Sequence, residues 1–308
     1  MFLLTSATLA ITSETDQGII AHAAALTKAG KVGEAETLLR SASSQNPDST
    51  ALHGALGGVL FKERKYEECI PELNIAAGED PDSREYTMSL AEALIGTQRF
   101  PVAVDFLTRS QARFGNDVQL HYDLGLAYYF MNKIGEAQEQ FEQSLRISPT
   151  FDRAQLLIAG CLIAQGNALQ AADLLRELVK KHPNNAVYWG TLGRTLAPMG
   201  EQNKVEAVHA CRRALALQPN DPHLQFDAGT VLTQIGNLIE ARAILEKLEK
   251  NHPEILAVHS QLARIYSRLG QKQLARNEVT IVAKLQQKGE SEAPAGLPGA
   301  FDQSAGPQ

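Results

Sequence analysis

The cysteines of this 308-residue sequence are the first candidates for chemistry, because thiolates serve as nucleophiles and metal ligands. The three cysteines, Cys69, Cys161 and Cys211, are far apart, and no CxxC pair is present that could bind zinc or exchange disulfides. An odd number of scattered cysteines also gives no disulfide framework, which slightly favours a reducing compartment. We therefore interpret all three as small core residues.

The eight histidines do not form a metal-binding pattern either. No HxxxH with an intervening glutamate appears, which argues against a zinc hydrolase. His182 and His252 each precede a proline, as expected of polar residues that cap the C-terminal end of a helix. Three others share one position of the repeat described below, where an imidazole can pack as a flat, partly buried group: His53, His121 and His259.

Carboxylates and glycine-rich stretches give no catalytic site. Adjacent carboxylates such as Glu67 and Glu68 point to different faces of a helix, so they cannot act as an acid and base pair. The glycine-rich stretch from Gly54 to Gly58 lacks the lysine and the preceding strand of a phosphate-binding loop. The sequence therefore predicts a protein that is not an enzyme, with no catalytic residue, no cofactor and no metal ligand.

The elements that carry these residues follow a 34-residue repeat. A proline, or a glycine in its place, closes each copy, and one interval is longer by two residues: Pro47, Pro81, Gly115, Pro149, Pro183, Pro219 and Pro253. A fixed period of this length is typical of solenoids built from helix pairs, because proline cannot continue a helix. Eight copies fit residues 16–289, and they start near residues 16, 50, 84, 118, 152, 186, 222 and 256.

Other positions recur in phase with the prolines. Small residues occupy one position of the first helix: Ala23, Gly57, Ala91, Gly125, Ala159, Gly193, Gly229 and Ala263. Mostly large apolar residues occupy a position of the second helix: Leu39, Leu73, Leu107, Phe141, Leu175, Cys211, Leu245 and Val279. Two antiparallel helices approach closely where a small side chain on one faces a large side chain on the other. A left-handed turn between the helices is predicted at Gly30, Asn132, Gly166, Gly200, Gly236 and Gly270.

These positions resemble the tetratricopeptide repeat. The fourth copy carries the pattern most fully, as Leu124, Gly125, Tyr128, Ala137, Phe141, Ser144 and Pro149, and the sixth opens with Trp189, Leu192 and Gly193. The resemblance implies an all-α, right-handed superhelical solenoid of antiparallel helix pairs. It also implies that the first helices line a concave groove and the second helices form the outer wall. Pro198 departs from the pattern and should end or bend the first helix of the sixth copy.

The family's known clamp for acidic peptide tails is not implied. It requires lysine and asparagine at set groove positions, which in the first three copies hold Ile20, Ala24, Ala55, Glu85 and Ser89. A co-chaperone function therefore does not follow from the resemblance.

Both ends of the sequence differ from the repeats. Residues 1–15 are apolar enough to pack on the first repeat as an end cap, or to be a clipped signal peptide without its basic segment. Residues 290–308 are rich in Gly, Pro, Ala and Ser, which predicts a disordered tail. Its large apolar residues, Leu297 and Phe301, are either incidental or a tethered ligand of the groove. The localisation stays open between the cytoplasm, which we favour, and a periplasmic or secreted protein.

The first helix of the fourth copy is apolar on nearly every side. A second stripe, distinct from its core stripe, consists of Tyr122, Leu126, Tyr129 and Phe130, and Leu157 continues it in the fifth copy. One interpretation is that neighbouring first helices bury these side chains against each other. The other is that they form the floor of a groove that binds a partner's helix or peptide, with Asp123 orienting a donor on the ligand.

Later copies place arginines on the same groove face. Arg194, Arg264 and Arg268 are predicted contacts, and the last two lie one helical turn apart, where they could grip a carboxylate. An ordinary solvated basic face is the alternative.

The sequence as a whole indicates a non-catalytic scaffold or adaptor that binds protein or peptide partners. With 35 acidic and 29 basic residues, a net charge of −6 argues against nucleic acid as the main partner. An RNA-binding helical-repeat protein and a regulatory subunit of an enzyme on another chain are the alternatives. No apolar run is long enough to span a membrane, and self-association through the ends of the solenoid is possible.

Overall fold

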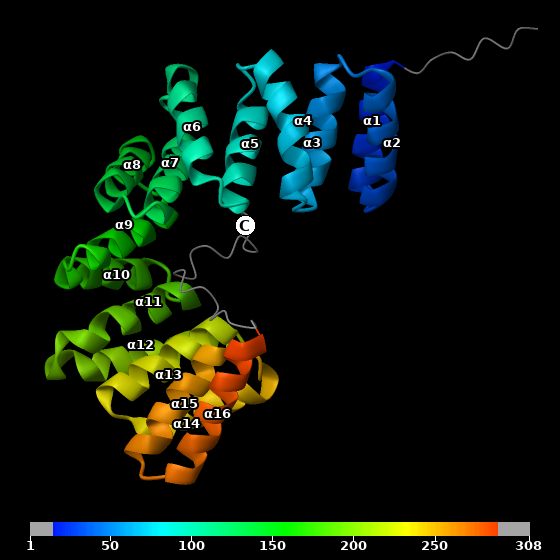
Figure 1. Cartoon of the computed structure of the whole chain (residues 1–308). Helices are drawn as coiled ribbons and strands as arrows, with labels where there is room; N and C mark the ends of the chain where they lie inside the picture. Colours follow the sequence, from blue (N-terminus) through cyan, green and yellow to red (C-terminus); the bar gives the residue numbers. More distant parts are fainter. Residues whose placement is uncertain (1–14, 289–308) are drawn as a thin grey trace, which may run out of the picture. The chain divides into compact units, whose positions relative to one another are not determined.

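The computed structural model describes residues 15–288, which form helix pairs throughout and contain no strand (Figure 1). The first helices of the pairs are α1 (Asp16–Lys28), α3 (Thr50–Lys62), α5 (Arg84–Gly96), α7 (Val118–Phe130), α9 (Asp152–Ala164), α11 (Ala186–Leu196), α13 (Pro222–Ile235) and α15 (Leu256–Arg268). The second helices are α2 (Val32–Gln45), α4 (Tyr66–Glu79), α6 (Phe100–Phe114), α8 (Ile134–Ile147), α10 (Ala168–Lys181), α12 (Lys204–Leu217), α14 (Leu238–Asn251) and α16 (Lys272–Lys288). The structure is therefore an all-α solenoid of helix pairs. Predictions for residues 1–14 and 289–308 lie outside the described part of the chain.

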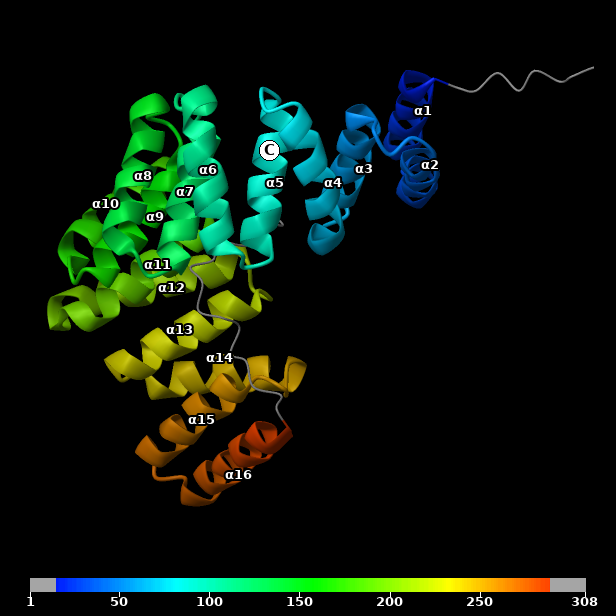
Figure 2. The same ribbon diagram turned by 45° about the horizontal axis from the view of Figure 1, so that its top comes forward.

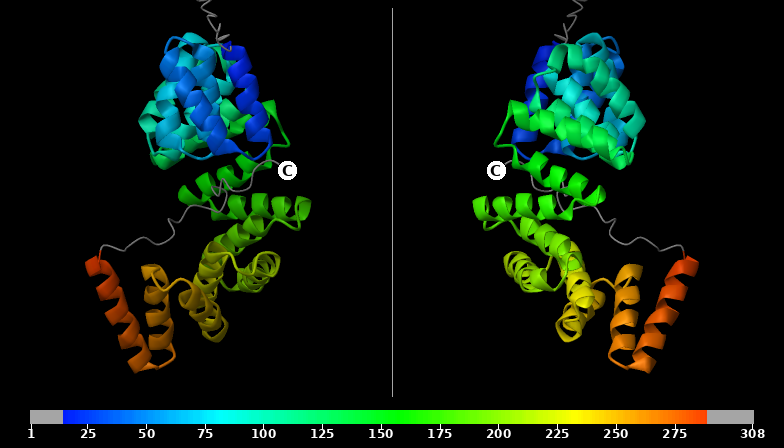
Figure 3. Two further views of the ribbon diagram at one scale, coloured as in Figure 1. Left: turned by 90° about the vertical axis from the view of Figure 1, so that its right-hand side faces the viewer. Right: turned by 90° about the vertical axis from the view of Figure 1, so that its left-hand side faces the viewer.

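Backbone contacts divide the chain into two compact units, Met1–Ile147 and Ser148–Gln308, where the sequence predicted one continuous array. In the first unit, each second helix packs on its own first helix, and α1, α3, α5 and α7 also contact one another in order (Figure 2). In the second unit, α11, α13 and α15 form the corresponding row, and α15 and α16 lie side by side (Figure 3). A solenoid divides easily in this way because each repeat contacts only its neighbours.

Local sequence signals set the helix ends. Most first helices begin after a side chain that accepts a hydrogen bond from a backbone N–H of the first turn: Thr15, Ser49, Ser83, Asp117, Asn185 and Asp221. The predicted turn positions all have positive φ, from 58° at Asn132 to 99° at Gly200. Arg64 and Gln98 adopt the same conformation, at φ of 60° and 59°, although neither is a glycine.

The small residues of the first helices make room for the second helices, as predicted. A Cβ added to Gly125 would lie 2.5 Å from the ring of Phe141, which is fully buried. The same relation holds between Gly229 and Leu245, where the distance would also be 2.5 Å. These close approaches would be impossible with a larger side chain on the first helix.

Pro198 shortens the first helix of the sixth repeat, as predicted. Helix α11 ends at Leu196, and 3-10 turns at Ala197–Met199 and Glu201–Asn203 lead into α12. The proline lies in the first of these turns, where its missing N–H breaks no α-helical hydrogen bond.

In five repeats, one position of the first helix forms a hydrogen bond with the preceding loop. In each of these repeats its side chain donates a hydrogen bond to the carbonyl oxygen six residues earlier: His53 to Pro47, His121 to Gly115, Trp189 to Pro183, Gln225 to Pro219 and His259 to Pro253. The donor–acceptor distances run from 2.7 Å for Gln225 to 3.0 Å for His121. The histidines here were interpreted from the sequence as packing groups, and the structure adds this specific polar contact.

Candidate functional site

The first helices of the first three repeats line a groove in the first unit. The groove has a volume of about 340 Å³ and is bounded by α1, α3 and α5, with Leu39 of α2 beneath it. Pockets of about 300–1,000 Å³ are typical of ligand sites. Ile20, Ala24, Ala55 and Glu85, the residues that replace the family's clamp, lie among the groove residues.

The floor of the groove is open because its side chains are small. Ala24 and Ala55 line it, and a Cβ added to Gly58 would have no heavy atom within 4 Å. Gly54 serves a different purpose, because an added Cβ would lie 2.3 Å from the ring of Tyr86. The groove therefore combines an unfilled centre at Gly58 with a tightly packed wall at Gly54.

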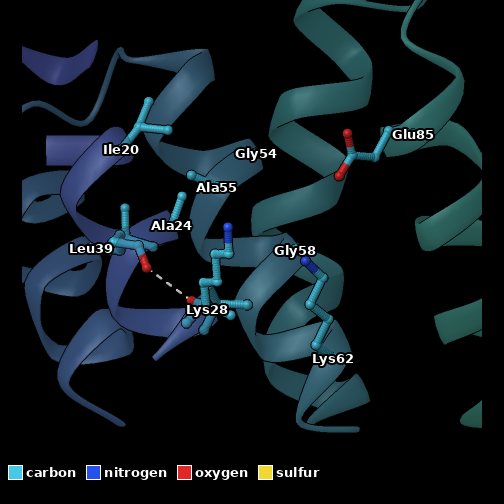
Figure 4. A pocket seen from close by; sticks show the side chains of 12 residues that line it. Ile20, Ala24, Lys28, Leu39, Gly54, Ala55, Gly58, Lys62 and Glu85 are labelled. Atoms are coloured by element: carbon cyan, nitrogen blue, oxygen red, sulfur yellow. Dashed lines mark hydrogen bonds between the residues drawn. The ribbon is translucent and has the colours of Figure 1, made fainter. Parts of the chain in front are cut away.

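Charged residues stand at the edges of the groove. Lys28 and Lys62 occupy the same position of two successive repeats and extend from α1 and α3, with Glu85 on α5 across from them (Figure 4). Both lysines are exposed, and neither forms an ion pair with any residue between 15 and 288. By contrast, Lys65 at the start of α4 binds Glu36 at 2.7 Å. Lys28 and Lys62 are therefore the cations that this groove offers to a ligand.

The predicted contacts on α7 lie mostly inside the first unit. Tyr122, Asp123 and Leu126 are nearly fully buried, and the ring of Tyr122 lies 5.9 Å from that of Phe141. Asp123 accepts a hydrogen bond of 2.8 Å from the Gln119 amide. This burial favours the interpretation that these three residues pack against neighbouring helices.

The two predicted aromatic contacts at the end of α7, Tyr129 and Phe130, are only partly buried. Phe130 stacks on Phe100 of α6 with ring centroids 4.9 Å apart, and Tyr129 meets Phe130 edge to face. These rings retain exposed area that a partner could contact.

In the second unit the predicted contacts have other roles. Leu157 is fully buried. Arg194 forms an ion pair of 3.2 Å with Asp227, whose pKa is raised by burial although Arg194 counteracts the shift. Arg268 donates a hydrogen bond to the carbonyl of Thr233 near the C-terminal end of α13, and both Arg264 and Arg268 are exposed. Arg264 and Arg268 stay predicted contacts for a carboxylate of a partner.

Sequence reasoning missed Lys28 and Lys62. A lysine in the last turn of a helix is expected because it interacts favourably with the helix dipole, so neither residue stood out. The usable signal was their spacing of exactly one repeat.

Helix pairs stacked in register, with a groove lined by the first helices, define the chain as a helical-repeat solenoid. A family model described as tetratricopeptide repeat matches residues 26–93 and 131–194. These matches support the resemblance to the tetratricopeptide repeat family that the residues indicated. This fold generally mediates protein–protein interaction and is typically a non-catalytic scaffold.

Similar proteins agree on the fold. The chain is 24% identical over 209 residues to the tetratricopeptide repeat-containing protein trd-1 of Caenorhabditis elegans; the match covers 66% of this chain but only 26% of that relative. A tetratricopeptide repeat protein from Parabacteroides merdae superposes with a TM-score of 0.68 at 15% identity, covering 81% of this chain and 98% of that one. The protein pilF of Pseudomonas aeruginosa gives a TM-score of 0.57 at 20% identity, covering 71% and 97%.

Identities this low establish the fold and no shared ligand. Within residues 15–288, no helix is both long and apolar enough to cross a bilayer.

Proposed function

We propose that this chain is a protein-interaction scaffold whose first three repeats hold an extended acidic peptide in the groove of α1, α3 and α5. The observation that carries the proposal is the pair of exposed lysines, Lys28 and Lys62, one repeat apart and without ion-pair partners in the described chain, beside a floor of small residues. The proposal places no catalytic step on this chain.

The spacing of the lysines sets the spacing of acidic residues in the ligand. Packed helix axes lie about 8–10 Å apart, and an extended chain advances about 3.3 Å per residue. Carboxylates about three residues apart in the peptide therefore match Lys28 and Lys62. Small apolar side chains between them fit above Gly58, and Glu85 favours a basic residue or the peptide's amino end nearby.

The aromatic residues of α7 extend the proposal. Tyr129 and Phe130 are partly buried and belong to the same unit as the groove. They remain predicted contacts for an apolar side chain of a partner.

The test is selection from a randomised peptide library on the purified chain, followed by fluorescence anisotropy with the selected peptides. We expect enrichment of acidic residues about three positions apart. Because an exposed ion pair contributes about 0.2–1 kcal/mol and charge reversal adds repulsion, the double variant Lys28→Glu/Lys62→Glu should weaken binding at least about tenfold.

Two further variants separate charge from shape. Lys180→Glu/Lys250→Glu makes the same change in net charge on second helices of the other unit, and it should leave binding unchanged. Gly58→Leu fills the open centre of the groove and should abolish binding while the helix content is retained. The proposal is wrong if no acidic peptides are enriched, or if both lysine double variants weaken binding equally.

A further inference from the structure

A buried cluster of three potential metal ligands lies in the last described repeat. Glu249 of α14, His259 of α15 and Glu278 of α16 bring one ligand atom each to within 4.8 Å of the others. The Nδ1 atom of His259 lies 2.7 Å from Glu278 and 3.5 Å from Glu249. The side chains of His259 and Glu278 are only 2% and 8% exposed, so both lie in the interior.

The other ring nitrogen of His259 is held by the backbone, so that Nδ1 is the nitrogen that faces the two carboxylates. Its Nε2 lies 2.8 Å from the carbonyl oxygen of Pro253, and because a carbonyl can only accept, Nε2 carries the proton. In the neutral imidazole, Nδ1 then presents a lone pair to two carboxylates. Metal-bound histidines usually have this arrangement, in which the distal N–H is held by a backbone carbonyl or a carboxylate.

Equivalent positions in other repeats lack the second carboxylate. His53 faces Glu72 at 2.5 Å, and the position that corresponds to Glu249 holds Ser43. His121 faces Gln140 at 2.8 Å. The hydrogen bond to the preceding loop therefore does not require two carboxylates. The repeat itself does not explain why two carboxylates lie around His259.

Two carboxylates close together in a mostly buried place need a positive charge between them. The Glu249 side chain is 26% exposed, which gives an ion and a water molecule a route to the cluster.

We propose that Glu249, His259 and Glu278 bind a divalent cation of the Zn²⁺ type, with water as a fourth ligand. Zinc takes one imidazole nitrogen and carboxylate oxygens at about 2.0–2.2 Å, which puts tetrahedral ligand atoms about 3.3 Å apart. The distances of 2.7 and 3.5 Å around Nδ1 require only small side-chain adjustments to reach this geometry. The bound ion would cross-link α14, α15 and α16.

The direct test is isothermal titration of Zn²⁺ into tag-free, chelator-treated full-length chain. We expect a site that Glu249→Gln and His259→Gln each weaken at least about tenfold, the range seen when metal-site partners are removed. His53→Gln, in the equivalent position of the second repeat, is the matched control and should bind Zn²⁺ as the unaltered chain does. Mg²⁺ should not compete, because it prefers six oxygen ligands.

A second readout guards against variants that fail to fold. Glu249 is partly exposed, so Glu249→Gln should keep the far-ultraviolet circular dichroism of the unaltered chain. Zn²⁺ should raise the urea midpoint of the unaltered chain and not that of Glu249→Gln, since only a ligand that binds the folded state stabilises it. Absence of Zn²⁺ binding, or binding that Glu249→Gln and His259→Gln leave unchanged, overturns the proposal. Neither result bears on peptide binding, because the groove lies in the other unit.

Discussion

Adjacent glycines in α3 allow the packing between paired helices to be separated from helix propensity. Replacement of Gly57 or Gly58 by alanine gives the same gain of about 0.8–1 kcal/mol in helix propensity. The new methyl group of Gly58→Ala would have no heavy atom within 4 Å. That of Gly57→Ala would lie 2.7 Å from Cγ of Leu73 and 3.3 Å from its backbone nitrogen. Leu73 is buried and cannot turn into solvent.

The two variants should therefore change stability in different ways. Gly58→Ala should raise the free energy of unfolding by about 0.5–1 kcal/mol. Overpacking costs about 1–3 kcal/mol, so Gly57→Ala should range from neutral to about 2 kcal/mol less stable, and the two variants should differ by about 1–3 kcal/mol. Urea unfolding followed by far-ultraviolet circular dichroism measures this difference.

A double variant identifies the contact that is responsible. Leu73→Ala removes the side chain that the new methyl group would meet, so Gly57→Ala should cost less in that background, with a coupling of at least about 0.5 kcal/mol. If Gly57→Ala stabilises the chain as much as Gly58→Ala does, the small residue does not set the distance between α3 and α4, and the reasoning about the repeat fails.

Two further predictions concern acid stability and thiol reactivity. Hydrogen bonds from Lys65 and Arg40 lower the pKa of Glu36 from 4.5 to about 2. The ionised Glu36 carboxylate therefore adds stability above its unfolded pKa, and this stability is lost as the pH falls toward 2. The urea midpoints of Glu36→Gln and the unaltered chain should converge over that pH range. Burial raises the pKa of Cys69 to about 11 and of Cys211 to about 12. A thiol reagent at about pH 8 should therefore label neither cysteine before urea is added. Rapid labelling of the folded chain would contradict the placement of both cysteines in the core.

The fold could be predicted closely because the same physical requirement recurs in every copy. Most first helices begin after a capping side chain, and the first helices start at residues 16, 50, 84, 118, 152, 186, 222 and 256. The turn conformation of Arg64 and Gln98 could not be predicted from residue type. There the backbone hydrogen bonds that close the turn, from Lys65 to Leu60 and from Arg99 to Leu94, outweigh the preference of a side chain for negative φ.

The candidate site was harder to predict than the fold, because it depends on whether neighbouring residues cover a side chain or pair with it. The pattern of α7 showed that Tyr122 and Leu126 were apolar, but burial by neighbours and exposure to a groove give the same pattern. Lys28 and Lys62 did not stand out in the sequence, because lysines are commonly exposed on protein surfaces. Only the structure shows that Lys65 has an ion-pair partner and that Lys28 and Lys62 have none among residues 15–288.

The position shared by His53, His121 and His259 shows how a repeat can acquire a function without losing its fold. Trp189 makes the same hydrogen bond to the preceding loop with its one N–H, so a single donor satisfies the structural requirement. A histidine meets that requirement with Nε2 and keeps Nδ1 for another partner. Residues of neighbouring helices determine the partner of Nδ1, and they can change without disturbing the hydrogen bond from Nε2 to the preceding loop. Among the described histidines at this position, His259 has two carboxylates beside Nδ1, and for that reason we assign the cation to this repeat.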